Sequence, residues 1–378
     1  MFEIPIDRRG TAASKWERYA GRGVLPFWVA DMEFPSPPAV TEALKARVEH
    51  GIFGYTNVPD TLREQIIEHL ARDYGWAVQP DWLIWLPGVV PGLNVACRAV
   101  GAPGDGVITA VPIYFPFLSA PGNAERQCQR MQLLRRGDRW EMDLAGLQAS
   151  LDPRSRLFLL CNPQNPTGRV YTREELLALA AVAERHDLII CSDEIHAGLV
   201  LEETCRHLPI ASLAPEIARR SITLMAPTKT YNMPGLGFGF AIIPDPDLRA
   251  RFRASASGFM AHVGPLAITA AEAAYRHGAA WREALLIRLR ENRDRLQEAV
   301  AAMPGLTMTP VEATCLAWID ARGLEVEDPH RFFEDAGVGL SPGAQFGSPG
   351  FVRFNFGCAP PMLEEGIRRM QAAIAARR

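Results

Sequence analysis

The chain has 378 residues, of which 48% are hydrophobic, so it is long enough to bury a sizeable core and to form more than one domain. Its 40 basic and 43 acidic side chains give a formal net charge of −3, which argues against nucleic acid or an anionic membrane surface as a partner. No window approaches the roughly 18 apolar residues of a membrane span, and the opening MFEIPIDRRG predicts no secretory signal. The seven cysteines show no CxxC spacing, which favours reduced thiols in a cytoplasmic protein over disulfides or a metal site.

Short apolar segments alternate with helical patterns along most of the chain. The helical patterns lie at 172–186, where Thr172 and Glu175 form a predicted capping box, and at 265–303, with an interruption near Gly278. The segments read as buried strands are 107–111, 156–161, 187–193, 220–226 and 238–244. This alternation predicts an α/β fold with a mostly parallel central sheet covered on both faces.

The pattern changes after about residue 304. The stretches LTMTP, TCLAWID and FVRFNFG are typical of strands, and the final PMLEEGIRRMQAAIAARR is typical of a helix. We expect the first 45 residues to pack with this smaller α+β unit. The predicted organisation is a large domain at 46–290 and a small domain formed by 1–45 and 291–378.

Polar side chains follow four of the predicted strands. Tyr114 comes after 107–111, Asn165 after 156–161 and Lys229 after 220–226, while Asp193 lies at the tip of 187–193 and His196 three residues on. Each alone is also typical of a turn, a helix cap, packing or a surface charge. Because ligands of open α/β sheets bind at the carboxyl ends of the strands, we expect these side chains to share one site.

Such a set matches the needs of pyridoxal phosphate. That cofactor requires a lysine to hold it as a Schiff base, a carboxylate beside its ring nitrogen, a donor near its phenolic oxygen and an aromatic ring to stack on it. It also needs an anion pocket. The stretch LPGVVPGLNVAC offers one, because Gly88, Val89 and Val90 lie where a turn opens a helix and free N–H groups can face a phosphate.

Four motifs make a family resemblance visible. NPQNPTGR, SDEIH, APTKTYNMPGLG and FVRFNFGC resemble the fold-type I pyridoxal-phosphate-dependent aminotransferase superfamily (class I/II). WVADMEFPSPPAV, VEHGIFGYT and PEIARRSITLMAPTKTYNMPGL are similar to its cystathionine β-lyase branch, the MalY/PatB-type C–S lyases. The resemblance covers nearly the whole chain, and it implies the fold of that superfamily.

The resemblance also implies roles around the cofactor ring. Lys229 would carry the cofactor and then act as general base at the substrate. Asp193 would pair with the ring nitrogen, and Asn165 and His196 would face the phenolic oxygen. Tyr114 would stack on the ring.

Further roles concern the phosphate and the substrate. The backbone amides of Val89 and Val90 and the hydroxyl of Thr228 would hold the phosphate. Tyr55 would reach the phosphate of a neighbouring subunit, which implies a homodimer with shared active sites. The residues expected to bind the amino-acid substrate are Arg353, which would clamp its α-carboxylate, together with Ala30 and Asn165.

The chain departs from the family pattern at five positions. Ala226 and Gly237 stand where many members have a phosphate-binding serine and arginine, which leaves Thr228 as the hydroxyl donor. Gly198, Gly264 and Cys315 replace residues frequent in the lyase branch, and they would enlarge the pocket or remove polar contacts if they line it. These differences leave the cofactor assignment intact and the substrate open.

The resemblance implies a C–S β-lyase that cleaves cystathionine or a related cysteine S-conjugate to a thiol, pyruvate and ammonia. An aminotransferase, or another specialised pyridoxal-phosphate enzyme on the same scaffold, is the first alternative, because the same residues serve both reactions. A non-catalytic binding protein with this fold is the second. The intact Lys229, Asp193 and Arg353 argue against the latter.

Overall fold

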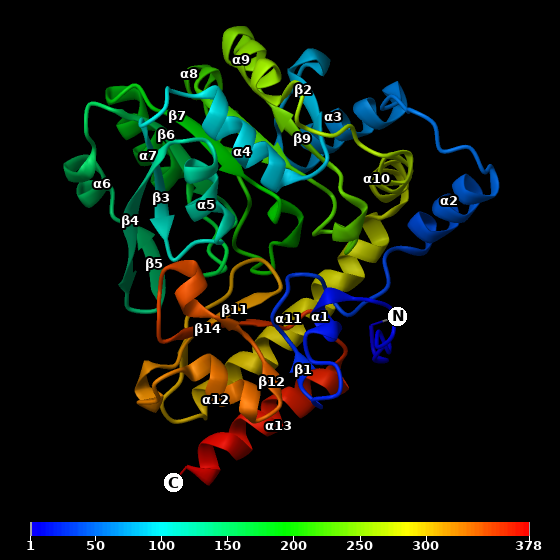
Figure 1. Ribbon diagram of the computed structural model, residues 1–378, viewed down its shortest axis with the longest axis vertical. Coiled ribbons are helices and arrows are strands. Elements are labelled where there is room, and N and C mark those ends of the chain that lie inside the picture. Colours follow the sequence, from blue (N-terminus) through cyan, green and yellow to red (C-terminus); the bar gives the residue numbers. More distant parts are fainter. Residues whose placement is uncertain (1, 378) are drawn as a thin grey trace.

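The computed structural model describes residues 2–377, arranged around a large and a small sheet (Figure 1). The α-helices are α1 (Ser14–Glu17), α2 (Pro38–Glu49), α3 (Asp60–Tyr74), α4 (Val89–Ala99), α5 (Pro116–Asn123), α6 (Leu144–Ser150), α7 (Arg173–Arg185), α8 (Pro215–Arg219), α9 (Pro246–Ala256), α10 (Pro265–His277), α11 (Ala279–Ala301), α12 (Pro329–Asp335) and α13 (Pro360–Ala376). The strands are β1 (Leu25–Pro26), β2 (Leu83–Leu86), β3 (Gly106–Val111), β4 (Gln127–Arg136), β5 (Arg139–Met142), β6 (Ser155–Cys161), β7 (Ile189–Asp193), β8 (Ser221–Met225), β9 (Gly239–Ile242), β10 (Thr307–Met308), β11 (Leu316–Asp320), β12 (Val338–Gly339), β13 (Ser341–Pro342) and β14 (Phe351–Asn355).

The large sheet has eight strands in the order β2-β9-β8-β7-β6-β3-β4-β5. The five central neighbours from β8 to β4 pair in parallel, whereas β9, β2 and β5 join antiparallel at the two ends. Strands β3, β6 and β8 are buried along almost their whole length, as expected of a parallel sheet with helices on both faces. The predicted α/β fold with a mostly parallel sheet is therefore confirmed.

Alternating side chains of β6 show how the two faces are filled. Leu157 and Leu159 pack in the apolar cluster that includes α4 and α9, while Phe158 and Leu160 pack on the opposite side with α7. All four are essentially buried, and each such side chain contributes about 1.5–3 kcal/mol relative to an exposed one. This two-sided core fixes the ends of the central strands, where the polar residues lie.

The predicted capping box at the start of α7 is confirmed. The Glu175 N–H donates to the Thr172 hydroxyl at 3.3 Å, and the Thr172 N–H donates to a Glu175 carboxylate oxygen at 2.7 Å. The other predicted long helix is split into α10 and α11 at Gly278, as the sequence indicates.

The small sheet has the order β10-β11-β14-β13 and is antiparallel. The N-terminal β1 pairs in parallel with β12, so the start of the chain joins the C-terminal unit, as expected (Figure 1). Residues 38–49 form α2, which packs against α10 rather than against the small sheet, because its apolar side meets α10.

The predicted domain boundary at residue 290 falls inside α11, a continuous helix from 279 to 301. The boundaries 46–290, 1–45 and 291–378 therefore stay predictions. Within residues 2–377, none of the helices is long and apolar enough to cross a membrane.

Candidate active site

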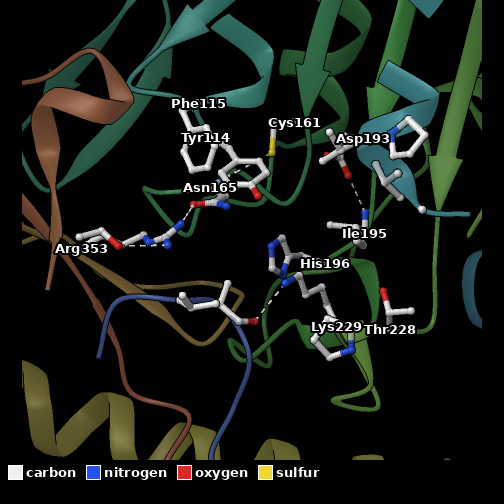
Figure 2. Close-up of a pocket in the computed structure, with 18 of the residues that line it drawn as sticks. Tyr114, Phe115, Cys161, Asn165, Asp193, Ile195, His196, Thr228, Lys229 and Arg353 are labelled. Atoms are coloured by element: carbon white, nitrogen blue, oxygen red, sulfur yellow. Dashed lines mark hydrogen bonds between the residues drawn. The ribbon is translucent and has the colours of Figure 1, made fainter. Parts of the chain in front are cut away.

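A pocket of about 430 Å³ lies where the central strands of the large sheet end, between that sheet and the small one. Tyr114 follows β3, Asn165 follows β6, Asp193 ends β7 and Lys229 follows β8. These strands are neighbours in the sheet and run in parallel, so their carboxyl ends meet at one edge. The structure thus brings the four side chains into one pocket (Figure 2).

Lys229 points its amine into this pocket. Its Nζ donates to the carbonyl oxygen of Ala30 at 3.2 Å, a neutral acceptor from the N-terminal segment. Burial lowers the pKa of Lys229, while nearby Cys315 and Asp31 oppose that shift. The amine therefore has a larger uncharged fraction near neutral pH than a surface lysine, which a nucleophile or a base requires.

Asp193 is a buried carboxylate with little support for its charge. One oxygen accepts a hydrogen bond from the Ile195 N–H at 3.0 Å. Burial raises the pKa of Asp193 to about 7; the Ile195 N–H and the charge of Lys229 act in the opposite direction. A cationic ligand group beside this carboxylate would supply the missing positive charge.

Arg353, on β14, is buried to 4% exposure without a carboxylate partner among the described residues. Its Nη1 donates to the Asn165 side-chain oxygen at 2.9 Å, and its Nη2 donates to the Trp28 carbonyl at 2.8 Å and to the Ser341 hydroxyl at 3.3 Å. Its Nε has no partner in residues 2–377. Burial lowers the pKa of Arg353 to about 10. A guanidinium held by neutral oxygens alone is prepared for an anion from outside the chain.

His196 lies between Arg353 and Lys229 in the pocket (Figure 2). The side chain is 3% exposed, and its Nδ1 has no hydrogen-bond partner within the described part of the chain. Burial, reinforced by the charges of Lys229 and Arg353, lowers the pKa of His196 to about 3. The imidazole is therefore neutral at physiological pH and has a ring nitrogen free for a ligand.

The opposite end of the pocket is built for an anion. Helix α4 begins at Val89, so the N–H groups of Val89 and Val90 have no partner within the helix and face the pocket with Thr228. Gly88 precedes the helix with φ 153°, a conformation that is essentially restricted to glycine. Gly237 lines the same end with φ 52°, and a Cβ there would lie 3.1 Å from the Pro87 carbonyl oxygen.

Some residues singled out in the sequence lie elsewhere. Tyr55 is outside the pocket, in the segment after α2, with its side chain fully exposed. Gly198 packs against Thr230, Gly264 is the exposed residue before α10, and Cys315 is buried outside the pocket lining. Gly198, Gly264 and Cys315 do not line the pocket. They therefore neither enlarge it nor remove polar contacts from it.

The pocket also contains residues that the sequence analysis did not single out. They include Trp28, Phe115, Cys161, Ser341, Gln345 and Phe346. Trp28 could have been found, because it is two residues from Ala30 in the WVADMEF stretch. Ser341, Gln345 and Phe346 come from SPGAQFG, which has only the composition of an ordinary turn, and tertiary packing alone brings it to the site.

This donor set fits the expected cofactor. The pocket offers one amine, one buried carboxylate without a cation, a neutral histidine with an unpartnered nitrogen, an aromatic ring and a helix N-terminus. These are the groups that pyridoxal phosphate needs, and Arg353 remains for the carboxylate of an amino acid. Residues 2–377 contain no group of three or more His, Cys, Asp or Glu side chains suited to a metal ion.

Comparisons with known proteins agree with this geometry. Residues 23–370 match the family model described as aminotransferase class I and II. The chain is 37% identical to cystathionine beta-lyase PatB of Bacillus subtilis (strain 168), over 99% of this chain and 100% of the relative. It superposes on the crystal structure of OvoB with a TM-score of 0.98 at 47% identity, covering 100% and 99% of the two chains. It superposes on cystalysin from Treponema denticola, whose structure contains pyridoxal 5'-phosphate, with a TM-score of 0.95 at 31% identity, covering 100% and 99%.

Proposed function

The chain belongs to the aminotransferase class I and II family, and from this premise we propose that it is a pyridoxal-phosphate-dependent carbon–sulfur lyase. Its substrate is cystathionine or a related cysteine S-conjugate, cleaved to a thiol, pyruvate and ammonia. The relative PatB, named a cystathionine beta-lyase and matched over its full length, supports the reaction class. Arg353, buried without a carboxylate partner among the described residues and in one pocket with Lys229 and Asp193, is the observation that carries the cofactor and the amino-acid substrate.

Residues from four strand ends would hold the cofactor. Lys229 would bond to it covalently, Asp193 would pair with its ring nitrogen, and Asn165 and His196 would face its phenolic oxygen. Tyr114 would stack on the ring. The N–H groups of Val89 and Val90 and the Thr228 hydroxyl would bind the phosphate. When bound, pyridoxal phosphate supplies an electron sink that stabilises negative charge at the substrate α-carbon.

Arg353 binds the α-carboxylate of the substrate. A planar guanidinium can donate two parallel hydrogen bonds to a carboxylate, and the low dielectric of the pocket strengthens that pair. A carboxylate also removes the cost of an uncompensated buried charge. Asn165 and the backbone of Ala30 lie beside this position and complete the substrate contacts.

Lys229 is the general base. Once its nitrogen is free, it takes the proton from the substrate α-carbon, and the lowered pKa of its amine keeps part of it uncharged for that step. The Ala30 carbonyl holds the nitrogen at its present place through a 3.2 Å hydrogen bond. Asp193, in its charged form, would stabilise positive charge on the ring nitrogen.

A spectroscopic experiment tests this function against the aminotransferase alternative. The protein loaded with pyridoxal phosphate is mixed with L-cystathionine, with no keto acid present, and its yellow absorption band is followed during turnover. A lyase keeps the band, because it returns the cofactor unchanged after each cycle. Stoichiometric loss of the band, as the cofactor takes the amino group, would instead identify an aminotransferase.

We also infer a homodimer in which Tyr55 of one subunit reaches the active site of the other. The support is a row of exposed apolar side chains that includes Tyr55 itself, namely Val48, Ile52, Phe53 and Tyr55. Such a contiguous set on a protein surface is typical of an interaction site. We place the enzyme in the cytoplasm; the seven free cysteines are compatible with a reducing compartment.

A further inference from the structure

The strap, which we define as residues 28–34, crosses the active-site pocket as irregular backbone. Its carbonyl groups hold both functional cations of the site. The Trp28 carbonyl accepts from Arg353 Nη2 at 2.8 Å, and the Ala30 carbonyl accepts from Lys229 Nζ at 3.2 Å. The position of the strap therefore determines where the carboxylate clamp and the catalytic amine lie.

On its other side the strap contributes Asp31 and Glu33 to the N-terminal charge cluster, whose other two members are Arg8 and Lys15. Lys15 Nζ donates to the Asp31 carbonyl at 2.7 Å and lies 2.9 Å from a Glu33 carboxylate oxygen. Arg8 bridges the two acidic side chains, at 2.7 Å from Asp31 and 3.0 Å from Glu33. The Asp31 carbonyl is next to that of Ala30, so the cluster binds the strap one peptide away from the Lys229 contact.

The strap has cavities on both sides. The active-site pocket of about 430 Å³ and a second cavity of about 810 Å³ are both lined by Val29, Lys229 and Pro234. The second cavity is also lined by all four residues of the N-terminal charge cluster. Met32 and Phe34 anchor the end of the strap in the core, whereas the part around Val29 lies between the two cavities, where close packing cannot fix the backbone from every side. Polar contacts therefore determine the position of this part, namely those of the charge cluster and those of Asn355 Nδ2, which donates to the Val29 and Asp31 carbonyls.

The burial of the cluster fits that role better than a role in stability. The side chains of Lys15 and Glu33 are each only 2% exposed. Desolvating two such charges costs several kcal/mol per ion, and a well-packed apolar pair in their place is often equally stable. What an apolar pair cannot provide is the directed hydrogen bond from Lys15 to the strap.

We propose that the N-terminal charge cluster is a positioning device that sets the Trp28 and Ala30 carbonyls, and through them Arg353 and Lys229. The inference rests on the proposed function, which gives Arg353 and Lys229 their roles. The cluster touches neither substrate nor cofactor in this account, so it acts only through the strap.

The test is the double variant Lys15→Met/Glu33→Leu. It removes the two buried charges together, so it avoids the uncompensated charge that either single change would leave. The matched control is Asp7→Asn/Arg9→Gln, which removes an ion pair in the same N-terminal segment whose side chains are 58% and 75% exposed. Hydrogen exchange of the strap amides is measured on the cofactor-free proteins, and KM and kcat on the loaded ones.

We expect the double variant to remain folded and to exchange the strap amides about tenfold faster than the wild type. Its KM should rise about tenfold while kcat falls less, because the carboxylate clamp loses its alignment. The control should match the wild type in strap-amide exchange and in KM and kcat. Unchanged strap exchange together with unchanged KM in the folded double variant would overturn the positioning role. Absence of lyase turnover in the wild type would overturn the proposed function instead, because the exchange measurement needs neither cofactor nor substrate.

Discussion

Asp193 shows how function and stability are opposed at a single residue. The carboxylate is buried at the end of β7, and its one hydrogen bond, from the Ile195 N–H, does not compensate for burial. Its pKa is therefore about 7 in this structure instead of 3.8. A cationic ring nitrogen would reverse that imbalance. The protein thus keeps a group whose charge is unfavourable until the cofactor binds.

A first prediction concerns the stability of the cofactor-free protein. Between pH 3.8 and about 7 the folded protein holds a proton on Asp193 that the unfolded chain has lost, so the free energy of unfolding falls as pH rises through this range. Asp193→Asn should remove this dependence and make the cofactor-free protein more stable at pH 8, by up to about 4 kcal/mol. Denaturant unfolding at pH 5 and pH 8 measures it. The exposed Asp187→Asn is the control, and an equal pH dependence in the wild type and in Asp193→Asn would refute the prediction.

A second prediction concerns Arg353. Arg353→Ala should lower kcat/KM by the equivalent of about 3–5 kcal/mol, the cost of removing one side of a buried charge pair. Arg353→Lys should recover only part of the loss, because an ammonium cannot form the bidentate contact. The exposed Arg295→Ala, which removes an ion pair with Glu364, is the control. Near-normal kcat/KM in Arg353→Ala would remove this residue from the site.

At the level of the elements, the central strands were the predictable part. The strands β3, β6, β7, β8 and β9 are short continuous apolar runs, and the residues that follow them have the types that a cofactor site requires. Strands β4 and β5, at one end of the large sheet, were not predicted. Their exposed positions carry polar and charged residues such as Gln127, Arg130 and Arg136, so neither shows the continuous apolar run by which the central strands were recognised. The Ser341–Phe346 wall was missed because tertiary packing alone brings it to the pocket.

A third prediction belongs to the loop that joins β8 to β9. Gly237→Ala should cost about 1–2 kcal/mol for placing a side chain at φ 52°, and its Cβ would press on the Pro87 carbonyl beside the start of α4. It should therefore also weaken cofactor binding. The control is Gly23→Ala, which has φ 65° and no atom within 4 Å of the added Cβ. Thermal unfolding of both variants measures the loss of stability, and cofactor titration measures the loss of affinity. Equal cofactor affinity in Gly237→Ala and Gly23→Ala would contradict the expected pressure on the loop.

At the scale of the whole molecule, the two sheets and the N-terminal segment enclose one site. Arg353 comes from the small sheet, Asp193 and Lys229 from the large one, and the strap from the start of the chain. The fold therefore builds the pocket from segments more than 300 residues apart. Tyr55 and its apolar neighbours Val48, Ile52 and Phe53 are exposed in the single chain, where the proposed homodimer would cover them.

A fourth prediction tests shared active sites. Tyr55→Ala and Lys229→Ala should each be nearly inactive, because each removes one residue from every site. Mixed in equal amounts and allowed to exchange subunits, they should regain about a quarter of the wild-type activity, since half of the dimers then carry one intact site. Light scattering establishes the dimer. No recovery after proven subunit exchange would place Tyr55 outside the partner's site.

The most direct measurement for the central claim is a product assay. The protein loaded with pyridoxal phosphate is incubated with L-cystathionine and no keto acid, and pyruvate and free thiol are followed together. We predict catalytic release of both in equal amounts, and none from Lys229→Ala. Release of neither product by the wild type, while its cofactor takes up the amino group, would contradict the lyase and identify an aminotransferase that uses the same residues.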